Sequence, residues 1–354
     1  MKRICVFTNT LASGGAEKQS LMLANTLKDK YSVWLVVFYG EFVEKKFADF
    51  IDRNQIRQIR LSGSILARLV SFFKFIRQNK IDVIFSYLLT TNLIGGVVGK
   101  AAGVKYTIGG IRSSKLDKNK IFLQKMLQNY VNNYTIYNNY RGLAILSDLG
   151  FTAKKALVIP NFLSIQSAIL KRPTNDVITI LSVGRFHEAK DYETAIKAIS
   201  ALSTRFERFQ YIIIGYGSLE KEIREWVEIY NVDRNVSIVV NPPNLADYYY
   251  SADIYLLTSI FEGLSNTVLE AMDRALPLVV TNVGDNDRLV KNGVNGFLCR
   301  PKNVDEIANS LLILCTKPEM RREYGTKSHQ ILKENFSQEN FEQSYIQLIE
   351  SLSK

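Results

Sequence analysis

The chain has 354 residues, of which 47% are hydrophobic and 22% are charged. This length and apolar content predict two globular domains and exclude a disordered tail protein. The three cysteines are odd in number and form no CxxC pair, which indicates neither a disulfide framework nor a zinc site and favours a reducing compartment. The first residues do not read as a secretory signal, and no apolar run approaches about 18 residues. We therefore expect a cytoplasmic protein without a membrane-spanning helix.

Charge is unevenly distributed along the chain, whose formal net charge is +11. Residues 1–165 carry 24 Lys and Arg against 9 Asp and Glu, whereas residues 166–354 carry 21 against 25. A one-sided positive field attracts nucleic acid, anionic lipid or phosphorylated substrates. The motifs must decide among these partners.

Short apolar runs alternate with amphipathic segments along the chain, which is typical of parallel sheets flanked by helices. In the first half, the predicted strands are residues 3–8, 33–38, 56–61, 83–85, 106–108 and 134–137. The predicted helices between them are residues 16–29, 65–79, 90–102 and 118–131.

A polar stretch, residues 164–176, separates these elements from a second series of strands. The strands predicted there are residues 179–183, 211–214, 237–240, 254–257, 278–281 and 296–298. We predict an α/β protein of two Rossmann-like, doubly wound parallel-sheet domains that face each other across a ligand cleft. The predicted domains are residues 1–165, residues 166–335 and a C-terminal helix, 336–354, that packs back toward the first domain.

Two glycines follow the first predicted strand, in the segment TNTLASGGAE. Gly14 and Gly15 open a helix, where bare amides and the positive helix end can receive a phosphate or approach a sugar closely. The segment matches neither GxGxxG nor a P-loop, so no dinucleotide or ATP site is predicted. Plain turn chemistry is the alternative.

A basic loop follows the strand predicted at residues 179–183. Its two cations, Arg185 and Lys190, stand five residues apart and are well placed to neutralise a diphosphate. A solvated loop is the alternative. The single His187 between them indicates a hydrogen-bonded loop residue rather than a catalytic base.

The strongest signal is a pair of carboxylates, Glu262 and Glu270, in EGLSNTVLE. A helix is predicted to begin near Asn266 or Thr267, which places Glu262 in the preceding loop and Glu270 in the first helical turn. Such carboxylates are good acceptors for vicinal sugar hydroxyls. Backbone amides that can bind further oxygens belong to Gly263, Leu264 and Ser265. A capping box of Thr267 with Glu270, and a surface position for Glu262, are the alternatives.

Taken in order, these segments resemble the family 4 retaining glycosyltransferases, which have the two-domain GT-B fold. The matching segments are GGAE at 14–17, VIPN at 158–161, VGRFHEAKD at 183–191, IIGYG at 213–217, SADIYLLTS at 251–259, EGLSNTVLEAM at 262–272 and NGVNGFL at 292–298. The resemblance spans essentially the whole chain. It implies an enzyme of bacterial surface-polysaccharide synthesis.

The resemblance also implies roles for single residues. Glu262 is expected to meet the donor sugar and Glu270 the nucleotide ribose, while Arg185 and Lys190 bind the diphosphate. The remaining donor-binding residues are expected to be Gly14, Gly15, Gly263, Leu264 and Ser265. We expect a nucleotide-sugar donor, with uridine diphosphate as the family's usual nucleotide, and neither a metal nor another cofactor. No protein nucleophile is required in this mechanism. The leaving phosphate can itself accept the acceptor's proton, which is consistent with the missing histidine.

The chain departs from the family pattern in two places. Many members carry a histidine after the fourth strand, but residues 1–165 contain none and Tyr87 stands at the equivalent place. In VGDNDRLV, Asp285 and Arg288 replace the family's glycine and glutamate, and Ser265 stands where proline is common. We expect a branch with its own sugar or acceptor preference and no histidine-assisted mechanism.

Segments 64–80 and 115–131 combine apolar residues at helical spacing with lysines and arginines. The apolar residues, which an ordinary helix would turn to the core, are Ile65, Leu66, Leu69, Phe72, Phe73, Ile76, Phe122, Met126 and Tyr130. Core packing does not explain the positive charge, and each Lys or Arg near an anionic leaflet contributes about 1 kcal/mol. We expect peripheral docking on the inner face of the cell membrane and a polyprenyl-diphosphate-linked glycan acceptor. The expected acceptor contacts are Tyr87, Arg112 and Lys115.

Two other classes of protein stay open. A nucleic-acid-binding protein would use the basic half, but no recognisable motif interleaves with the charge, so we expect no nucleic-acid partner. A related enzyme with a soluble acceptor, such as a glucan synthase, or a nucleotide-sugar epimerase would also use a nucleotide sugar. The carboxylate pair and the modest length disfavour both.

Overall fold

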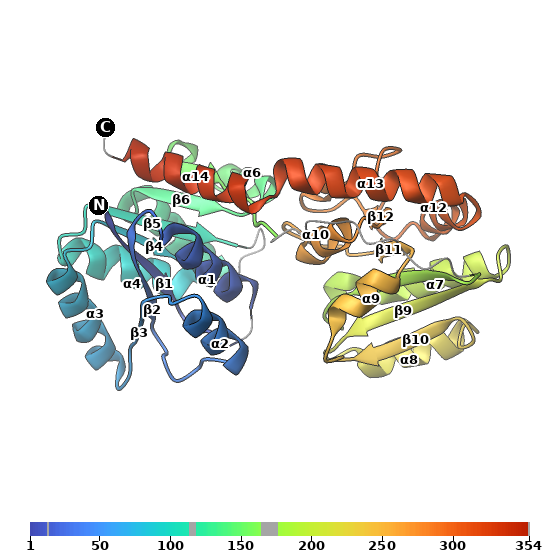
Figure 1. Cartoon of the computed structure of the whole chain (residues 1–354), viewed down its shortest axis with the longest axis horizontal. Helices are drawn as coiled ribbons and strands as arrows, with labels where there is room; N and C mark the ends of the chain where they lie inside the picture. The colour runs from blue at the N-terminus through green and yellow to red at the C-terminus, as the bar shows by residue number, and fades with distance from the viewer. Residues whose placement is uncertain (13, 113–117, 164–175, 353–354) are drawn as a thin grey trace. The chain divides into compact units, whose positions relative to one another are not determined.

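The computed structural model describes residues 1–12, 14–112, 118–163 and 176–352. The chain divides into two compact units. Unit 1 comprises Met1–Asn161 and Phe341–Lys354, and unit 2 comprises Phe162–Asn340. Each unit is a parallel sheet flanked by helices (Figure 1). The predicted fold class, two Rossmann-like domains, is confirmed.

The sheet of unit 1 has seven strands in the order β3-β2-β1-β4-β5-β6-β7. The strands are β1 Arg3–Thr8, β2 Ser32–Val37, β3 Gln58–Arg60, β4 Val83–Ser86, β5 Tyr106–Ile111, β6 Tyr134–Tyr137 and β7 Ala156–Val158. The helices are α1 Gly15–Leu27, α2 Lys45–Arg53, α3 Ile65–Asn79, α4 Leu88–Ala101, α5 Lys118–Met126, the π-helix η1 Leu127–Val131, α6 Tyr140–Asp148 and the short 3-10 helix η2 Ala153–Lys155. Phe7 of β1 stacks on Phe72 of α3, with ring centroids 4.2 Å apart, so the central strand anchors this helix layer.

The last helix, α14, spans Gln338–Ser351, and from Phe341 on it belongs to unit 1. Its buried Tyr345 packs edge-on against Phe85 of β4, with ring centroids 5.4 Å apart. Glu342 forms an ion pair with Lys30 at 3.0 Å. The C-terminal segment therefore completes the core of the unit that contains the first strand.

The sheet of unit 2 has six strands in the order β10-β9-β8-β11-β12-β13. The strands are β8 Ile178–Val183, β9 Phe209–Gly215, β10 Val236–Val240, β11 Ile254–Leu257, β12 Leu278–Thr281 and β13 Gly296–Cys299. The helices are η3 Glu188–Lys190, α7 Tyr192–Ser203, α8 Glu220–Ile229, α9 Leu245–Ser251, α10 Asn266–Asp273, α11 Asn286–Leu289, α12 Val304–Thr316 and α13 Pro318–Asn335. The chain order reverses between β8 and β11, and ligands of such sheets bind beyond the strand ends at this reversal.

The apolar residues of α3, and of α5 with η1, face the core only in part. On α3, Phe72 and Ile76 are buried, but Ile65, Leu66 and Phe73 are exposed, Leu66 at 72% of its surface. On α5 and η1 the exposed residues are Phe122, Met126 and Tyr130. The alternative of ordinary core-facing helices therefore accounts for Phe72 and Ile76 but not for the exposed apolar residues.

Candidate donor site

Two loops of unit 2 meet where β8 and β11 end. The amide of Ile260 donates to the carbonyl of Ala189 at 2.9 Å, and the hydroxyl of Thr258 donates to the carbonyl of Lys190 at 3.0 Å. These bonds hold the basic loop that follows β8 against the carboxylate loop that follows β11. The two sequence motifs therefore form one site.

Lys190 and Glu262 form an ion pair in this site. The Lys190 Nζ lies 2.6 Å from the Glu262 Oε1, and the two side chains are only 18% and 13% exposed. The same Oε1 accepts a hydrogen bond from the Ser259 hydroxyl at 2.7 Å. Because an ammonium has three hydrogens, Lys190 can hold Glu262 and still donate to an anion.

The second predicted cation, Arg185, stands in the same loop and is exposed. Within the described part of the chain its guanidinium has no hydrogen-bond or ion-pair partner. His187 accepts a hydrogen bond from the amide of Ala189 through its Nδ1, at 3.2 Å. His187 is thus the hydrogen-bonded loop residue that the sequence predicts, and Arg185 is available to an incoming anion.

A glycine after β12 packs closely against the backbone of the carboxylate loop. Gly284 has a φ of +59°, and a Cβ there would lie 2.4 Å from the carbonyl oxygen of Gly263 and 2.6 Å from that of Glu262. The next residue, Asp285, donates its amide to the same Gly263 carbonyl at 3.0 Å. The position of Glu262 therefore depends on the absence of a side chain at residue 284.

We expect Gly284→Ala to destabilise unit 2 more than Gly293→Ala does. Both glycines have positive φ, but a Cβ on Gly293 meets nothing within 4 Å. Gly293→Ala should cost about 1 kcal/mol through backbone strain, and Gly284→Ala roughly 1–3 kcal/mol more through the clash. Urea denaturation of the two variants measures the difference. Equal losses would show that the loop moves aside without cost.

Glu270 lies on α10, which begins at Asn266 with Ser265 as its N-cap. Glu270 is therefore beyond the first helical turn, and the prediction that it lies within that turn was wrong. Thr267 lies inside the helix rather than at the N-cap, so the alternative of a capping box is wrong as well. The side chains of Leu264 and Ser265 are buried at the start of this helix. The predicted amides of Gly263, Leu264 and Ser265 thus belong to the segment that leads into α10.

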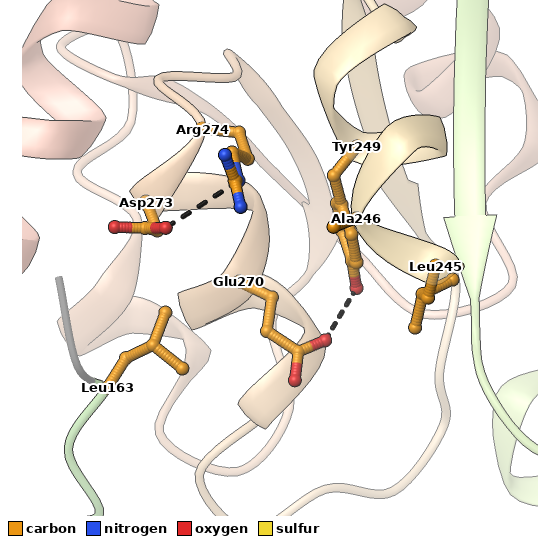
Figure 2. A pocket seen from close by; sticks show the side chains of 7 residues that line it. All are labelled: Leu163, Leu245, Ala246, Tyr249, Glu270, Asp273 and Arg274. Atoms are coloured by element: carbon orange, nitrogen blue, oxygen red, sulfur yellow. Dashed lines mark hydrogen bonds and ion pairs between the residues drawn. The ribbon is translucent and has the colours of Figure 1, made fainter. Parts of the chain in front are cut away.

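A pocket of about 270 Å³ lies between α9 and α10 (Figure 2). It is lined by Leu163, Leu245, Ala246, Tyr249, Glu270, Asp273 and Arg274. The buried Tyr249 of α9 donates its hydroxyl to the Glu270 Oε2 at 2.9 Å. Burial raises the pKa of Tyr249 well above its ordinary value, so this hydroxyl stays a donor. One wall of the pocket therefore holds a carboxylate in a fixed place.

The predicted glycine pair lies in unit 1, where Gly14 is the N-cap of α1 and Gly15 its first residue. A Cβ on Gly14 would lie 2.0 Å from the Glu17 Oε2. The other oxygen of Glu17 accepts a hydrogen bond from Thr10 at 3.1 Å. The glycine thus lets the Glu17 carboxylate fold back over the helix start.

Two of the predicted acceptor residues, Tyr87 and Arg112, directly follow β4 and β5 in unit 1. The third, Lys115, lies outside the described residues. Tyr87 is buried, and its hydroxyl oxygen lies 3.4 Å from that of Tyr345. Arg112 stacks over the Tyr87 ring at 4.5 Å and donates to the Asn161 side chain at 2.9 Å. Burial raises the pKa of Tyr87 well above its ordinary value. The role of these residues toward an acceptor stays a prediction.

The sequence did not point to Ser259, Tyr249 or Glu17 as site residues. Ser259 is the second residue after the end of β11, which was a usable signal because residues there lie at the ligand edge of the sheet. Tyr249 is one of three consecutive tyrosines before β11, and nothing in the spacing distinguishes it. Among the described residues, no group of three or more His, Cys, Asp or Glu is arranged to hold a metal ion.

Known proteins resemble both the sequence and the fold. Residues 166–330 match the family model described as glycosyl transferases group 1. An uncharacterized glycosyltransferase of Haemophilus influenzae is 26% identical over 338 residues, which cover 93% of this chain and 94% of that protein. The GalNAc-alpha-(1->4)-GalNAc-alpha-(1->3)-diNAcBac-PP-undecaprenol alpha-1,4-N-acetyl-D-galactosaminyltransferase of Campylobacter jejuni is 23% identical and covers 99% of this chain and 98% of its own.

Among solved structures, Anabaena Alr3699/HepE in complex with UDP superimposes with a TM-score of 0.85 at 16% identity, and the match covers 99% of this chain and 100% of that one. This likeness supports the two-domain GT-B fold. With the glycosyl transferases group 1 match over residues 166–330, the comparisons identify the chain as a glycosyltransferase.

Proposed function

We propose that the chain is a family 4 retaining enzyme that transfers a hexosyl or N-acetylhexosaminyl group from a UDP-sugar to a polyprenyl-diphosphate-linked glycan. The pathway would be bacterial O-antigen, capsule or exopolysaccharide synthesis. The observation that carries the proposal is the ion pair at the strand ends of unit 2, in which the Lys190 Nζ lies 2.6 Å from the Glu262 Oε1. The UDP in the Anabaena structure and the undecaprenol-linked acceptor in the name of the Campylobacter enzyme support the donor and acceptor classes.

In this proposal, the basic loop binds the leaving group. Lys190 and Arg185 neutralise the diphosphate as the bond between its oxygen and the anomeric carbon breaks, which is the preorganised electrostatic stabilisation that often dominates catalysis. Glu262, fixed by Lys190 and Ser259, accepts hydrogen bonds from the sugar. The acceptor oxygen bonds to the anomeric carbon from the same face, and its proton passes to an oxygen of the departing diphosphate.

The two units take different substrates in this proposal. Unit 2 holds the nucleotide sugar, with Glu270 at the ribose, while unit 1 meets the acceptor through Tyr87, Arg112 and Lys115. Gly14 and Gly15, at the start of α1 in unit 1, are further residues proposed for donor binding. The positive charge of residues 1–165 supports this division, since the acceptor carries a diphosphate and is embedded in a membrane.

Four neighbouring helices of unit 1, α3, α4, α5 and η1, supply a surface for membrane attachment on the inner leaflet. Helix α4 packs between α3 and η1, and residues 65–79, 88–101 and 118–131 contain no Asp or Glu. Exposed apolar side chains on these helices are Ile65, Leu66, Val70, Phe73, Val97, Phe122, Met126 and Tyr130. Exposed cations stand beside those of α3, namely Lys74, Arg77 and Lys80. Exposed cations and apolar side chains on helices that carry no acidic residue complement anionic lipid.

Among the described residues, no helix has the length and apolar character needed to cross a membrane.

Release of nucleoside diphosphate tests the proposal directly. The purified chain is incubated with a panel of UDP-, GDP- and ADP-sugars, with and without lipid extracts that contain polyprenyl-diphosphate glycans. We expect release of UDP that depends on the lipid-linked acceptor, together with transfer of label into the lipid phase. Release with soluble glycans alone would favour the soluble-acceptor alternative. Binding of nucleic acid without any release would refute the proposal.

A further inference from the structure

The hydroxyl of Tyr249 holds one oxygen of Glu270, and the ring that carries it is locked in the core. The ring of Tyr249 is 3% exposed and lies nearly parallel to the ring of Tyr255, with centroids 6.0 Å apart. Tyr255 in turn donates its hydroxyl to the carbonyl of Val183 at 3.3 Å. Because Val183 ends β8, the stacked pair links the carboxylate of α10 to the strand that carries the basic loop.

A fixed donor sets the plane of the Glu270 carboxylate. In Figure 2 the side chain of Glu270 extends from α10 toward the hydroxyl of Tyr249. The hydrogen bond from this hydroxyl to the Glu270 Oε2, 2.9 Å long, joins two residues of the pocket lining. The phenol cannot move without disturbing its stack on Tyr255. The bond therefore restrains the rotation of the carboxylate about its last torsion, which is otherwise a soft one.

We propose that Tyr249 is a positioning residue that gives the enzyme its preference for ribonucleotides over 2′-deoxyribonucleotides. The proposal rests on the proposed function, in which Glu270 accepts hydrogen bonds from the ribose hydroxyls. A carboxylate meets two vicinal hydroxyls only when its plane is correctly oriented. A 2′-deoxyribose offers one hydroxyl, which a rotated carboxylate still reaches. Orientation by Tyr249 therefore benefits the ribonucleotide most.

Calorimetric titration of UDP and 2′-deoxy-UDP tests the proposal on four proteins: wild type, Tyr249→Phe, Glu270→Gln and Tyr211→Phe. The last is a matched control, because the buried Tyr211 also donates its hydroxyl inside unit 2, to Ser182 at 2.8 Å. Tyr249→Phe should weaken UDP binding about tenfold, the scale of one hydrogen bond to a charged group, and 2′-deoxy-UDP binding by no more than about twofold. Tyr211→Phe should leave the preference for UDP unchanged.

The outcomes separate this inference from the proposed function. Loss of the UDP preference in Tyr249→Phe and Glu270→Gln, with thermal stability of Tyr249→Phe close to that of Tyr211→Phe, supports the positioning role. If Glu270→Gln loses the preference for UDP but Tyr249→Phe keeps it, the positioning role is overturned and the proposed function stands. A wild-type chain that binds neither nucleotide overturns both.

Discussion

Replacing Lys190 by alanine is expected to lower the rate of sugar transfer about 100-fold. The figure corresponds to roughly 3 kcal/mol of transition-state stabilisation, as for the loss of one preorganised electrostatic donor. The variant removes the cation that lies 2.6 Å from Glu262, while the hydrogen bond from Ser259 keeps the carboxylate in place. The measurement is kcat/KM for the nucleotide sugar with the lipid-linked acceptor. Full turnover in the variant would remove Lys190 from the site.

Lys197→Ala is the matched control for this variant. Lys197 lies on α7 and pairs with Glu193 at 2.9 Å, but these side chains are 40% and 39% exposed. An exposed pair of this kind contributes about 0.5 kcal/mol or less, so wild-type transfer is expected. Adding Glu262→Gln to Lys190→Ala should cost much less than the sum of the single losses, because the two residues act as a pair.

The sequence predicted most strands because buried parallel strands read as short apolar runs. β5 is longer than predicted, since it continues through Gly109 and Gly110 to Ile111. Glycine normally weakens a strand, but here Asn92 of α4 donates its side-chain amide to the carbonyl of Gly110 at 2.9 Å. A Cβ on Gly109 would lie 2.6 Å from the side chain of Asn132 and 3.3 Å from that of Asn92, and a Cβ on Gly110 would lie 2.9 Å from the carbonyl oxygen of Ser86. The glycines are needed for this close approach, which only the folded chain reveals.

Four short elements of unit 1 were not predicted, among them the three-residue helix η2, which buries no residue. Helix α2 buries only Phe47 and Ile51, so only two residues show the helical spacing of apolar side chains. Helix α6 buries only Gly142 and Leu146. Strand β7 is three residues long and none of them is fully buried. Elements that bury so little leave almost no pattern, and their packing against neighbours decides their structure.

The sequence predicted some residues of the candidate site but none of its contacts. Arg185, Lys190, Glu262 and Glu270 follow from the motifs, whereas the bond between Lys190 and Glu262 joins residues 72 positions apart. Which loops meet depends on β8 and β11 being neighbours, and spacing along the chain does not encode this. The bond from Tyr249 to Glu270 likewise requires that α9 and α10 pack side by side.

Reversing three charges on α3 and its C-cap is expected to weaken binding to anionic vesicles strongly. The variant Lys74→Glu, Arg77→Glu, Lys80→Glu removes about 3 kcal/mol of attraction, at about 1 kcal/mol for each cation, and adds repulsion. The partition coefficient into phosphatidylglycerol vesicles should therefore fall more than about 100-fold in low salt, measured by sedimentation. Failure of the wild-type chain to bind these vesicles would contradict the docking model.

A control with the same change of charge separates the α3 surface from the general basicity of unit 1. Lys45, Lys46 and Arg53 lie on α2 and are exposed, and the triple change of these residues to Glu alters the net charge equally. We expect this control to retain most of the binding. Equal loss in both triple variants would mean that the whole positive field of the unit, rather than α3, attracts the vesicle.

The apolar residues of α3 distinguish insertion from electrostatic attraction alone. Leu66 and Phe73 lie on one exposed face of the helix, and replacing both by Ser should reduce vesicle binding roughly 30-fold, at about 1 kcal/mol for each partly inserted side chain. The exposed Phe42, which lies outside these helices, provides the control Phe42→Ser. High salt screens the cations but not apolar burial, so insertion predicts that the difference between wild type and Leu66→Ser/Phe73→Ser persists there. All α3 variants should retain sugar transfer to an acceptor dispersed in detergent, because α3 contributes no residue to the donor site.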